Sequence, residues 1–187
     1  MISTNDLRPG TCFEHDDNIW QVTEYQHVKP GKGPAFVRVK IKNLRRGGIV
    51  ERTFRTSEKV EPLRVENRKA QYLYSSGSAF VFMDEESFEQ TEIPMDRLED
   101  KAGYMMENMT VTLITCRDEI LGVELPDFII TDVIKTDPGL KGDTAQGGSK
   151  PATIEGGAVV LVPLFIEEGE TIKVDTREGR YVERASK

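Results

Sequence analysis

Apolar and polar residues alternate along much of the chain, and this period of two predicts short β-strands rather than helices. The clearest segment is Ala35–Leu44, in which apolar residues alternate with cations: Val37, Val39 and Ile41 against Arg38, Lys40 and Lys42. Asn18–Gln26 precedes it and carries a weaker alternation. The two segments predict half-buried strands, the second with a cationic outer face.

A short stretch rich in glycine and proline separates these two strands, with the sequence Pro30-Gly31-Lys32-Gly33-Pro34. Because glycine and proline mark turns, the sequence predicts a β-hairpin with this stretch at its tip. A further turn at 46–49 and a strand at 49–56 would complete a small antiparallel barrel.

The rest of the chain also favours strands, which we predict at 78–84, 110–116, 120–125, 128–136, 158–166, 171–176 and 180–184. Residues 84–93 are acidic and are predicted to form a loop, as are residues 137–151. A short helix is expected at Met95–Lys101. Short strands at regular spacing are typical of barrels and sandwiches, so the fold class is all-β.

Charge divides the chain into three parts, which we take as domains at 1–64, 65–127 and 128–187. The first holds 12 basic and 8 acidic residues, the second 5 and 14, and the third 8 and 10, which leaves the chain at −7. Such a distribution would dock on a polyanion in one orientation, with the basic end foremost.

The composition is that of an ordinary globular protein, with 187 residues, 37% hydrophobic and 30% charged. The longest apolar runs, such as Ala158–Val162, are too short to cross a bilayer, and no secretory segment is visible. We therefore expect a cytoplasmic protein without membrane association. Cys12 and Cys116 lie far apart and form no CxxC motif, so we expect small core residues rather than a disulfide or zinc site.

The segment from Gln26 to Val50 contains no acid, and its basic residues are Lys29, Lys32, Arg38, Lys40, Lys42, Arg45 and Arg46. A patch of this kind is a candidate contact for nucleic acid. The alternative is a solvated strand face with no ligand.

Other chemistry finds little support in the sequence. Gly31-Lys32 lacks the upstream glycine and the following Ser or Thr of a phosphate-binding loop, and it lies between strands. The acidic run Asp84–Glu86 has no histidine nearby, which favours a solvated face over a metal or catalytic site. His27 lies beside the tip, where a structural role is favoured over RNA contact. We expect no catalytic residues, metal or cofactor, and hence a binding protein rather than an enzyme.

Three stretches resemble the bacterial elongation factor P family, and the resemblance covers essentially the whole chain. The first is "HVKPGKGPAFVRVKIKNLRRG", which is similar to the hairpin of the family's first domain. The second is "GDTA" at 142–145. The third is "KPATIEGGAVVLVPLFIEEGETIKVDTREGRYVER" at 150–184, which resembles the family's signature region.

The resemblance implies a KOW/SH3-like barrel followed by two OB-fold barrels, in an L shape with a tRNA-like outline. It implies a translation elongation factor that binds the 70S ribosome between the peptidyl and exit sites. There it would stimulate peptide-bond formation at consecutive prolines by positioning the peptidyl-tRNA. A lysine-modifying enzyme would act on Lys32, since the family often extends this tip residue, and a monomer is expected.

Site residues follow from the same resemblance. The expected tRNA contacts are Lys29, Pro30, Gly31, Lys32, Gly33, Arg38, Lys40, Lys42, Arg45 and Arg46. The expected contacts with the ribosome or mRNA are Gly142, Asp143, Thr144, Tyr181 and Arg184. Two alternatives stay open, which are a general RNA-binding regulator and a paralogous ribosome factor with a different stalling preference.

Overall fold

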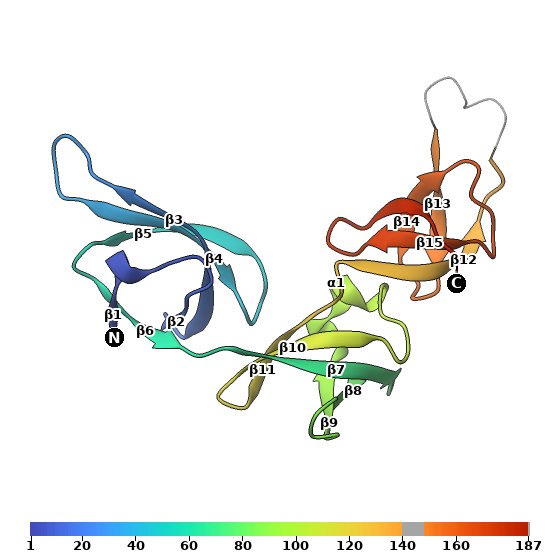
Figure 1. The fold of residues 1–187 in the computed structure, drawn as a ribbon, viewed down its shortest axis with the longest axis horizontal. Coiled ribbons are helices and arrows are strands. Elements are labelled where there is room, and N and C mark those ends of the chain that lie inside the picture. The colour runs from blue at the N-terminus through green and yellow to red at the C-terminus, as the bar shows by residue number, and fades with distance from the viewer. Residues whose placement is uncertain (140–147, 187) are drawn as a thin grey trace. The chain divides into compact units, whose positions relative to one another are not determined.

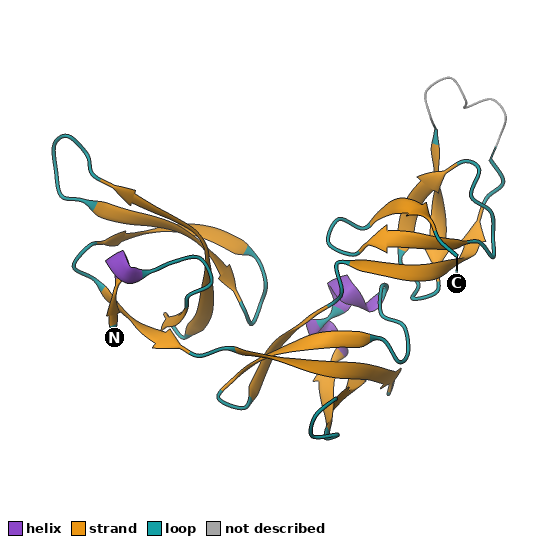
Figure 2. Cartoon of the chain, in the orientation of Figure 1, coloured by secondary structure: helices purple, strands orange, loops and turns teal. Residues whose placement is uncertain are grey.

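The structure is a computed structural model that describes residues 1–139 and 148–186. Strands dominate this part of the chain, with little helix among them (Figure 2). They form three sheets, and each sheet is curled (Figure 1). This confirms the all-β class and the three small β domains.

The first sheet has six strands in the order β1-β6-β2-β3-β4-β5. Their bounds are β1 Ile2–Ser3, β2 Cys12–His15, β3 Asn18–Val28, β4 Phe36–Asn43, β5 Ile49–Arg55 and β6 Lys59–Leu63. A 3₁₀ turn covers Thr4–Asp6. The predicted hairpin is confirmed, because β3 and β4 pair antiparallel from Trp20 opposite Asn43 to Val28 opposite Phe36.

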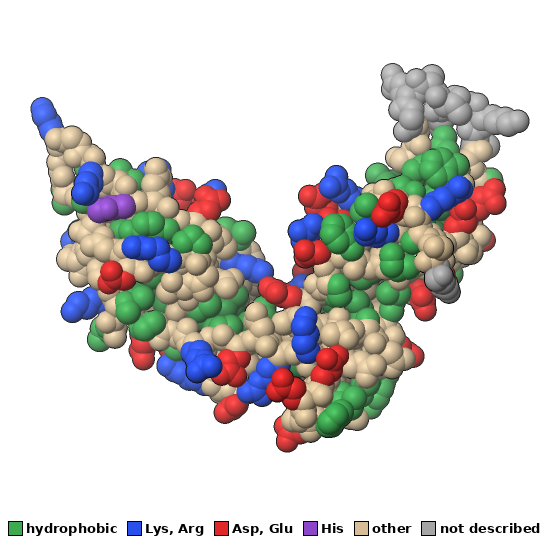
Figure 3. Space-filling view, viewed as in Figure 1, with side chains coloured by type: hydrophobic (Ala, Val, Ile, Leu, Met, Phe, Trp, Pro, Cys, Tyr) green, Lys and Arg blue, Asp and Glu red, His purple; other side chains and the backbone are tan. Residues whose placement is uncertain are grey.

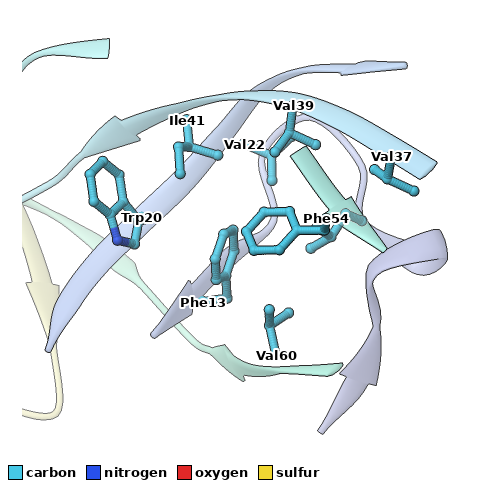
Figure 4. Close-up of a cluster of buried hydrophobic side chains, with 9 residues drawn as sticks. Phe13, Trp20, Val22, Val37, Val39, Ile41, Phe54 and Val60 are labelled. Atoms are coloured by element: carbon cyan, nitrogen blue, oxygen red, sulfur yellow. The ribbon is translucent and has the colours of Figure 1, made fainter. Parts of the chain in front are cut away.

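The core of the first barrel is built from the alternate positions that the sequence indicated. Val37, Val39 and Ile41 of β4 are each at most 1% exposed, and they face Phe13 and Phe54 across the barrel (Figure 4). The rings of Phe13 and Phe54 meet edge to face at 6.1 Å between centroids, an arrangement that aromatic pairs favour. The opposite face of β4 is therefore left for cations.

The second sheet has the order β11-β10-β7-β8-β9. Its strands are β7 Glu66–Ser75, β8 Ala79–Asp84, β9 Gln90–Pro94, β10 Thr110–Cys116 and β11 Glu119–Glu124. The expected helix is divided into a 3₁₀ turn at Met95–Arg97 and helix α1 at Glu99–Ala102. The predicted loop at 84–93 is wrong in its second half, because β9 pairs with β8 from Gln90 onward.

The third sheet has the order β14-β13-β12-β15-β16. Its strands are β12 Phe128–Thr136, β13 Ser149–Ile154, β14 Val159–Pro163, β15 Thr171–Asp175 and β16 Arg180–Arg184. The predicted loop at 137–151 is wrong at its end, because β13 begins at Ser149. Pro151 fits this strand because it lies beyond the β12 pairing, which stops at Ala152, so its missing N–H leaves no gap there.

Contacts divide the chain into two compact units. One contains Met1–Asn67 together with Leu113–Gly122, and the other contains Arg68–Thr112 together with Val123–Lys187. The turn between β10 and β11 thus belongs with the first barrel, although these strands hydrogen-bond within the second sheet. No helix in the described ranges is long and apolar enough to span a membrane.

Candidate nucleic-acid interface

The tip of the β3–β4 hairpin is an exposed loop at the end of the first barrel (Figure 1). Every residue from Lys29 to Pro34 is exposed. Gly33 has φ +114°, a conformation that residues with a side chain rarely adopt. Pro30 and Pro34 fix their own φ angles and so restrict the loop from both sides. The sequence therefore places Lys32 in an exposed loop whose backbone conformation is restricted on both sides.

Lys32 stands at the centre of this loop, and its ammonium group is available to a partner. Within residues 1–139 and 148–186, neither Lys32 nor Lys29 makes a hydrogen bond or an ion pair. In the space-filling view, a basic side chain caps the end of the hairpin (Figure 3). A flexible, strongly hydrated cation held in this way can bind a phosphate or serve as an amine for covalent modification.

The outward face of β4 continues onto β5 and adds a residue that sequence reasoning missed. Strand pairing places Phe36 opposite Arg55, and Arg38 opposite Thr53. Arg55 is exposed and lies in the pair nearest the tip. The alternation within the strand at 49–56 could have revealed it, because Phe54 is buried and its neighbour must then face outward.

Several of the predicted cations have acidic partners on the same face. Lys40 Nζ lies 2.9 Å from Glu24, and Arg38 Nε lies 3.5 Å from Glu51. These acids flank the acid-free segment in sequence, and strand pairing brings them beside it. The net positive charge of this face is therefore smaller than the sequence count implies, and it concentrates toward the tip.

Arg45 and Arg46 lie at the other end of the hairpin and differ from each other. The Arg45 guanidinium donates to both carboxylate oxygens of Glu119, at 3.1 and 2.8 Å, and to the carbonyl of Asp17 at 3.1 Å. The hydrogen bonds to Glu119 raise the pKa of Arg45 above its ordinary value. The Arg46 side chain has no such partner among the described residues. Lys42 of β4 lies opposite Gln21 of β3 on one side and opposite Ile49 of β5 on the other.

The residues predicted to contact the ribosome or mRNA belong to the third domain. Gly142, Asp143 and Thr144 lie outside the described residues. Tyr181 is half-buried and lines an apolar groove of about 380 Å³. Arg184 stacks on the Phe165 ring, 4.6 Å from its centroid, and pairs with a nearby glutamate.

The remaining candidates have structural roles. Asp84 accepts hydrogen bonds from the backbone N–H groups of Ser87 and Glu86, which lower the pKa of this carboxyl. It therefore caps a turn. Cys12 and Cys116 are both free and buried. In the described part of the chain, no group of three or more His, Cys, Asp or Glu side chains could hold a metal.

Comparison with known proteins agrees with this architecture. Residues 3–60 match the model of the elongation factor P KOW-like domain, residues 65–123 that of its OB domain, and residues 123–184 that of its C-terminal domain. A curated elongation factor P from Moorella thermoacetica is 51% identical over 185 residues, which are 99% of this chain and 100% of the relative.

Two solved structures are similar to part of this chain. Translation initiation factor 5A from Methanococcus jannaschii is 25% identical with a TM-score of 0.51, and the match covers 65% of this chain and 92% of that one. A factor 5A family protein from Naegleria fowleri is 19% identical with a TM-score of 0.49, and the match covers 66% and 96%.

These findings define the class of the protein, which is a translation factor built from β-barrel domains with a lysine-tipped hairpin. The chain belongs to the elongation factor P family. The family acts in protein synthesis as a translation elongation factor, a role that is not enzymatic.

Proposed function

We propose that this factor binds the ribosome between the peptidyl and exit sites and stimulates peptide-bond formation on ribosomes stalled at consecutive prolines. The hairpin tip would hold the end of the peptidyl-tRNA in a reactive position. The observation that carries this proposal is Lys32, an exposed cation on a restrained loop, which has no hydrogen-bond or ion-pair partner among the residues that the structure describes. Membership in the family of elongation factor P supports it.

Positioning suits the chemistry of proline. The ring fixes φ and restricts the preceding residue, so a prolyl acceptor and donor adopt few conformations. Correct placement of two reactants can supply several kcal/mol of a reaction barrier without acid–base groups. A cationic arm braced on the terminal sugar-phosphate of the tRNA would provide this placement.

The length of the hairpin also suits this role. Strand β3 has 11 residues, and at about 3.4 Å per residue an antiparallel strand of this length spans roughly 37 Å. The cations near the tip, Lys29, Arg38 and Arg55, would hold tRNA phosphates along this arm. Binding through such contacts should weaken as salt rises.

Two further assignments belong to the same proposal. Lys32 would be the substrate of a lysine-modifying enzyme that extends the side chain toward the tRNA. Tyr181, Arg184 and the 142–144 segment would contact the ribosome or mRNA. The factor would act in the cytoplasm as a monomer.

A reporter containing a run of prolines tests the function in cells that lack this factor. The wild-type chain and Lys59→Ala, which removes an exposed lysine from β6, should both restore translation of the reporter. Lys32→Ala should not. Full restoration by Lys32→Ala would contradict the tip mechanism.

Peptide mass spectrometry of the chain from its native host should show added mass on Lys32, and an unmodified peptide would contradict the modification.

A further inference from the structure

The base of the β3–β4 hairpin packs against the turn between β10 and β11, and both belong to the same compact unit. The hairpin base, together with β2, meets the adjoining ends of β10 and β11 in an apolar cluster of six buried residues: Cys12, Ile19, Leu44, Ile114, Cys116 and Leu121. Within the hairpin base, Leu44 N–H donates to the Ile19 carbonyl at 2.9 Å. The backbone of β11 also comes close, because a Cβ atom at Gly122 would lie 3.5 Å from the Leu44 carbonyl oxygen.

Ion pairs surround this cluster. In one, the first barrel supplies the arginine, and in the others it supplies the carboxylates. Arg45, which follows Leu44, reaches Glu119 on β11 in a bidentate pair. Arg117, from the β10–β11 turn, approaches Glu14 at 3.6 Å and Glu61 at 3.8 Å on the first barrel. A bidentate arginine–carboxylate pair fixes the relative orientation of its two groups more strictly than a single contact does.

We propose that the pair formed by Arg45 and Glu119 positions the hairpin, and that Arg45 does not serve as a phosphate contact. The pair holds the base of the hairpin on the β10–β11 turn and so sets where Lys32 is presented. Nothing in the sequence links these two residues, because they lie 74 positions apart.

The geometry of the arm makes the pair effective. The three nitrogens Nε, Nη1 and Nη2 of Arg45 already have protein acceptors, so binding a phosphate would require breaking this arrangement. Lys32 lies one strand length away, at about 3.4 Å per residue, so a rotation of about 5° at the base moves the tip by roughly 3 Å. A misplacement of about 1 Å can already slow a positioned reaction substantially.

The two cysteines report on the same contact. Both are buried in the cluster, and reagents reach a buried thiol only when its surroundings open. The rate at which a thiol reagent labels the folded chain therefore measures opening of this contact, independently of translation.

The test uses two single variants, Arg45→Ala and Glu119→Ala, and one double variant in which the two residues are exchanged, Arg45→Glu together with Glu119→Arg. Lys59→Ala, which removes an exposed lysine of β6 that lies outside the cluster, serves as the control. We measure thiol labelling, and the rate of Pro–Pro bond formation on purified ribosomes as a function of factor concentration. A partly exposed pair contributes up to about 1 kcal/mol, so each single variant should be labelled about three- to fivefold faster.

Each single variant should also show a lower maximal rate of bond formation at an unchanged half-saturating concentration. The exchanged pair should recover both properties toward the wild type. Lys59→Ala should leave labelling and maximal rate unchanged.

Three results would overturn the proposal. One is that Arg45→Ala raises only the half-saturating concentration, as a lost phosphate contact would, while Glu119→Ala has no effect. Another is that the single variants are labelled faster but keep the maximal rate of bond formation of the wild type. The third is that the single variants are labelled at the same rate as the wild type. The rate measurement rests on the proposed function. If the wild-type chain does not accelerate Pro–Pro bond formation, that function fails, whereas labelling still decides whether the pair holds the contact.

Discussion

Gly156 offers a strong test of the packing in the unit formed by Arg68–Thr112 and Val123–Lys187. It lies in the turn between β13 and β14, against the segment that follows α1. A methyl group at this position would lie 2.3 Å from the Gly103 carbonyl oxygen and 2.8 Å from its carbon. Both are backbone atoms, so relief requires a shift of the chain rather than of a side chain.

The cost of Gly156→Ala follows from two terms. The backbone must move by about 0.7 Å to reach 3.0 Å, and overpacking of this kind costs about 1–3 kcal/mol. The same Gly103 carbonyl accepts a hydrogen bond from Ala158 N–H at 3.0 Å, whose loss adds about 1 kcal/mol. The unfolding free energy of this unit should therefore fall by about 2–4 kcal/mol.

Hydrogen exchange measures this loss locally, through the Ala158 amide, which should exchange at least tenfold faster in the variant. Urea unfolding supplies the overall stability. Gly31→Ala is the control, since nothing lies within 4 Å of the methyl position, and it should leave both measurements unchanged. If Gly156→Ala and Gly31→Ala agree within about 0.5 kcal/mol, the proximity of Gly103 does not limit this unit.

Three other predictions concern the core, the pH response and the tip. Phe13→Ala should lower the unfolding free energy by about 3–5 kcal/mol in urea titrations, whereas Ile49→Ala, at a site 60% exposed, should be nearly neutral; equal effects would contradict the assigned core. Hydrogen bonds from Arg177 lower the pKa of Asp175 to about 2, so this carboxylate stabilises the fold above pH about 4 and the contribution is lost as pH falls toward 2. Asp175→Asn should remove that part of the acid response in thermal unfolding, and an unchanged profile would refute the assignment. Gly33→Ala, at φ +114°, should reduce stimulation of Pro–Pro bond formation without changing the melting temperature, and full activity would show that the tip tolerates another conformation.

The sequence predicted features that depend on local pattern. The alternation around Val39 specified β4, its buried face and the hairpin, because strand periodicity is a local property. The predicted loop at 84–93 is wrong in part, because the acidic composition hides the alternation of β9. This strand forms through its pairing with β8, which the local pattern does not show. Strands β2 and β6 carry weak patterns of their own and depend on each other.

The candidate site was predictable at its tip and less so at its base. The glycines and prolines around Lys32 indicate an exposed turn from the local sequence alone, with no contribution from distant residues. The partners of the cations were not predictable, since Glu24 and Glu51 reach them only through strand pairing. Arg45 is the extreme case, because Glu119 arrives from another sheet.

The most direct measurement of the central claim is the rate of a single Pro–Pro bond formation on purified ribosomes. The wild-type chain should accelerate this step, and Lys59→Ala should match it. Lys32→Ala should lose most of the acceleration at saturating concentration while still binding the ribosome. An equal acceleration by Lys32→Ala would show that the hairpin tip does not position the peptidyl-tRNA.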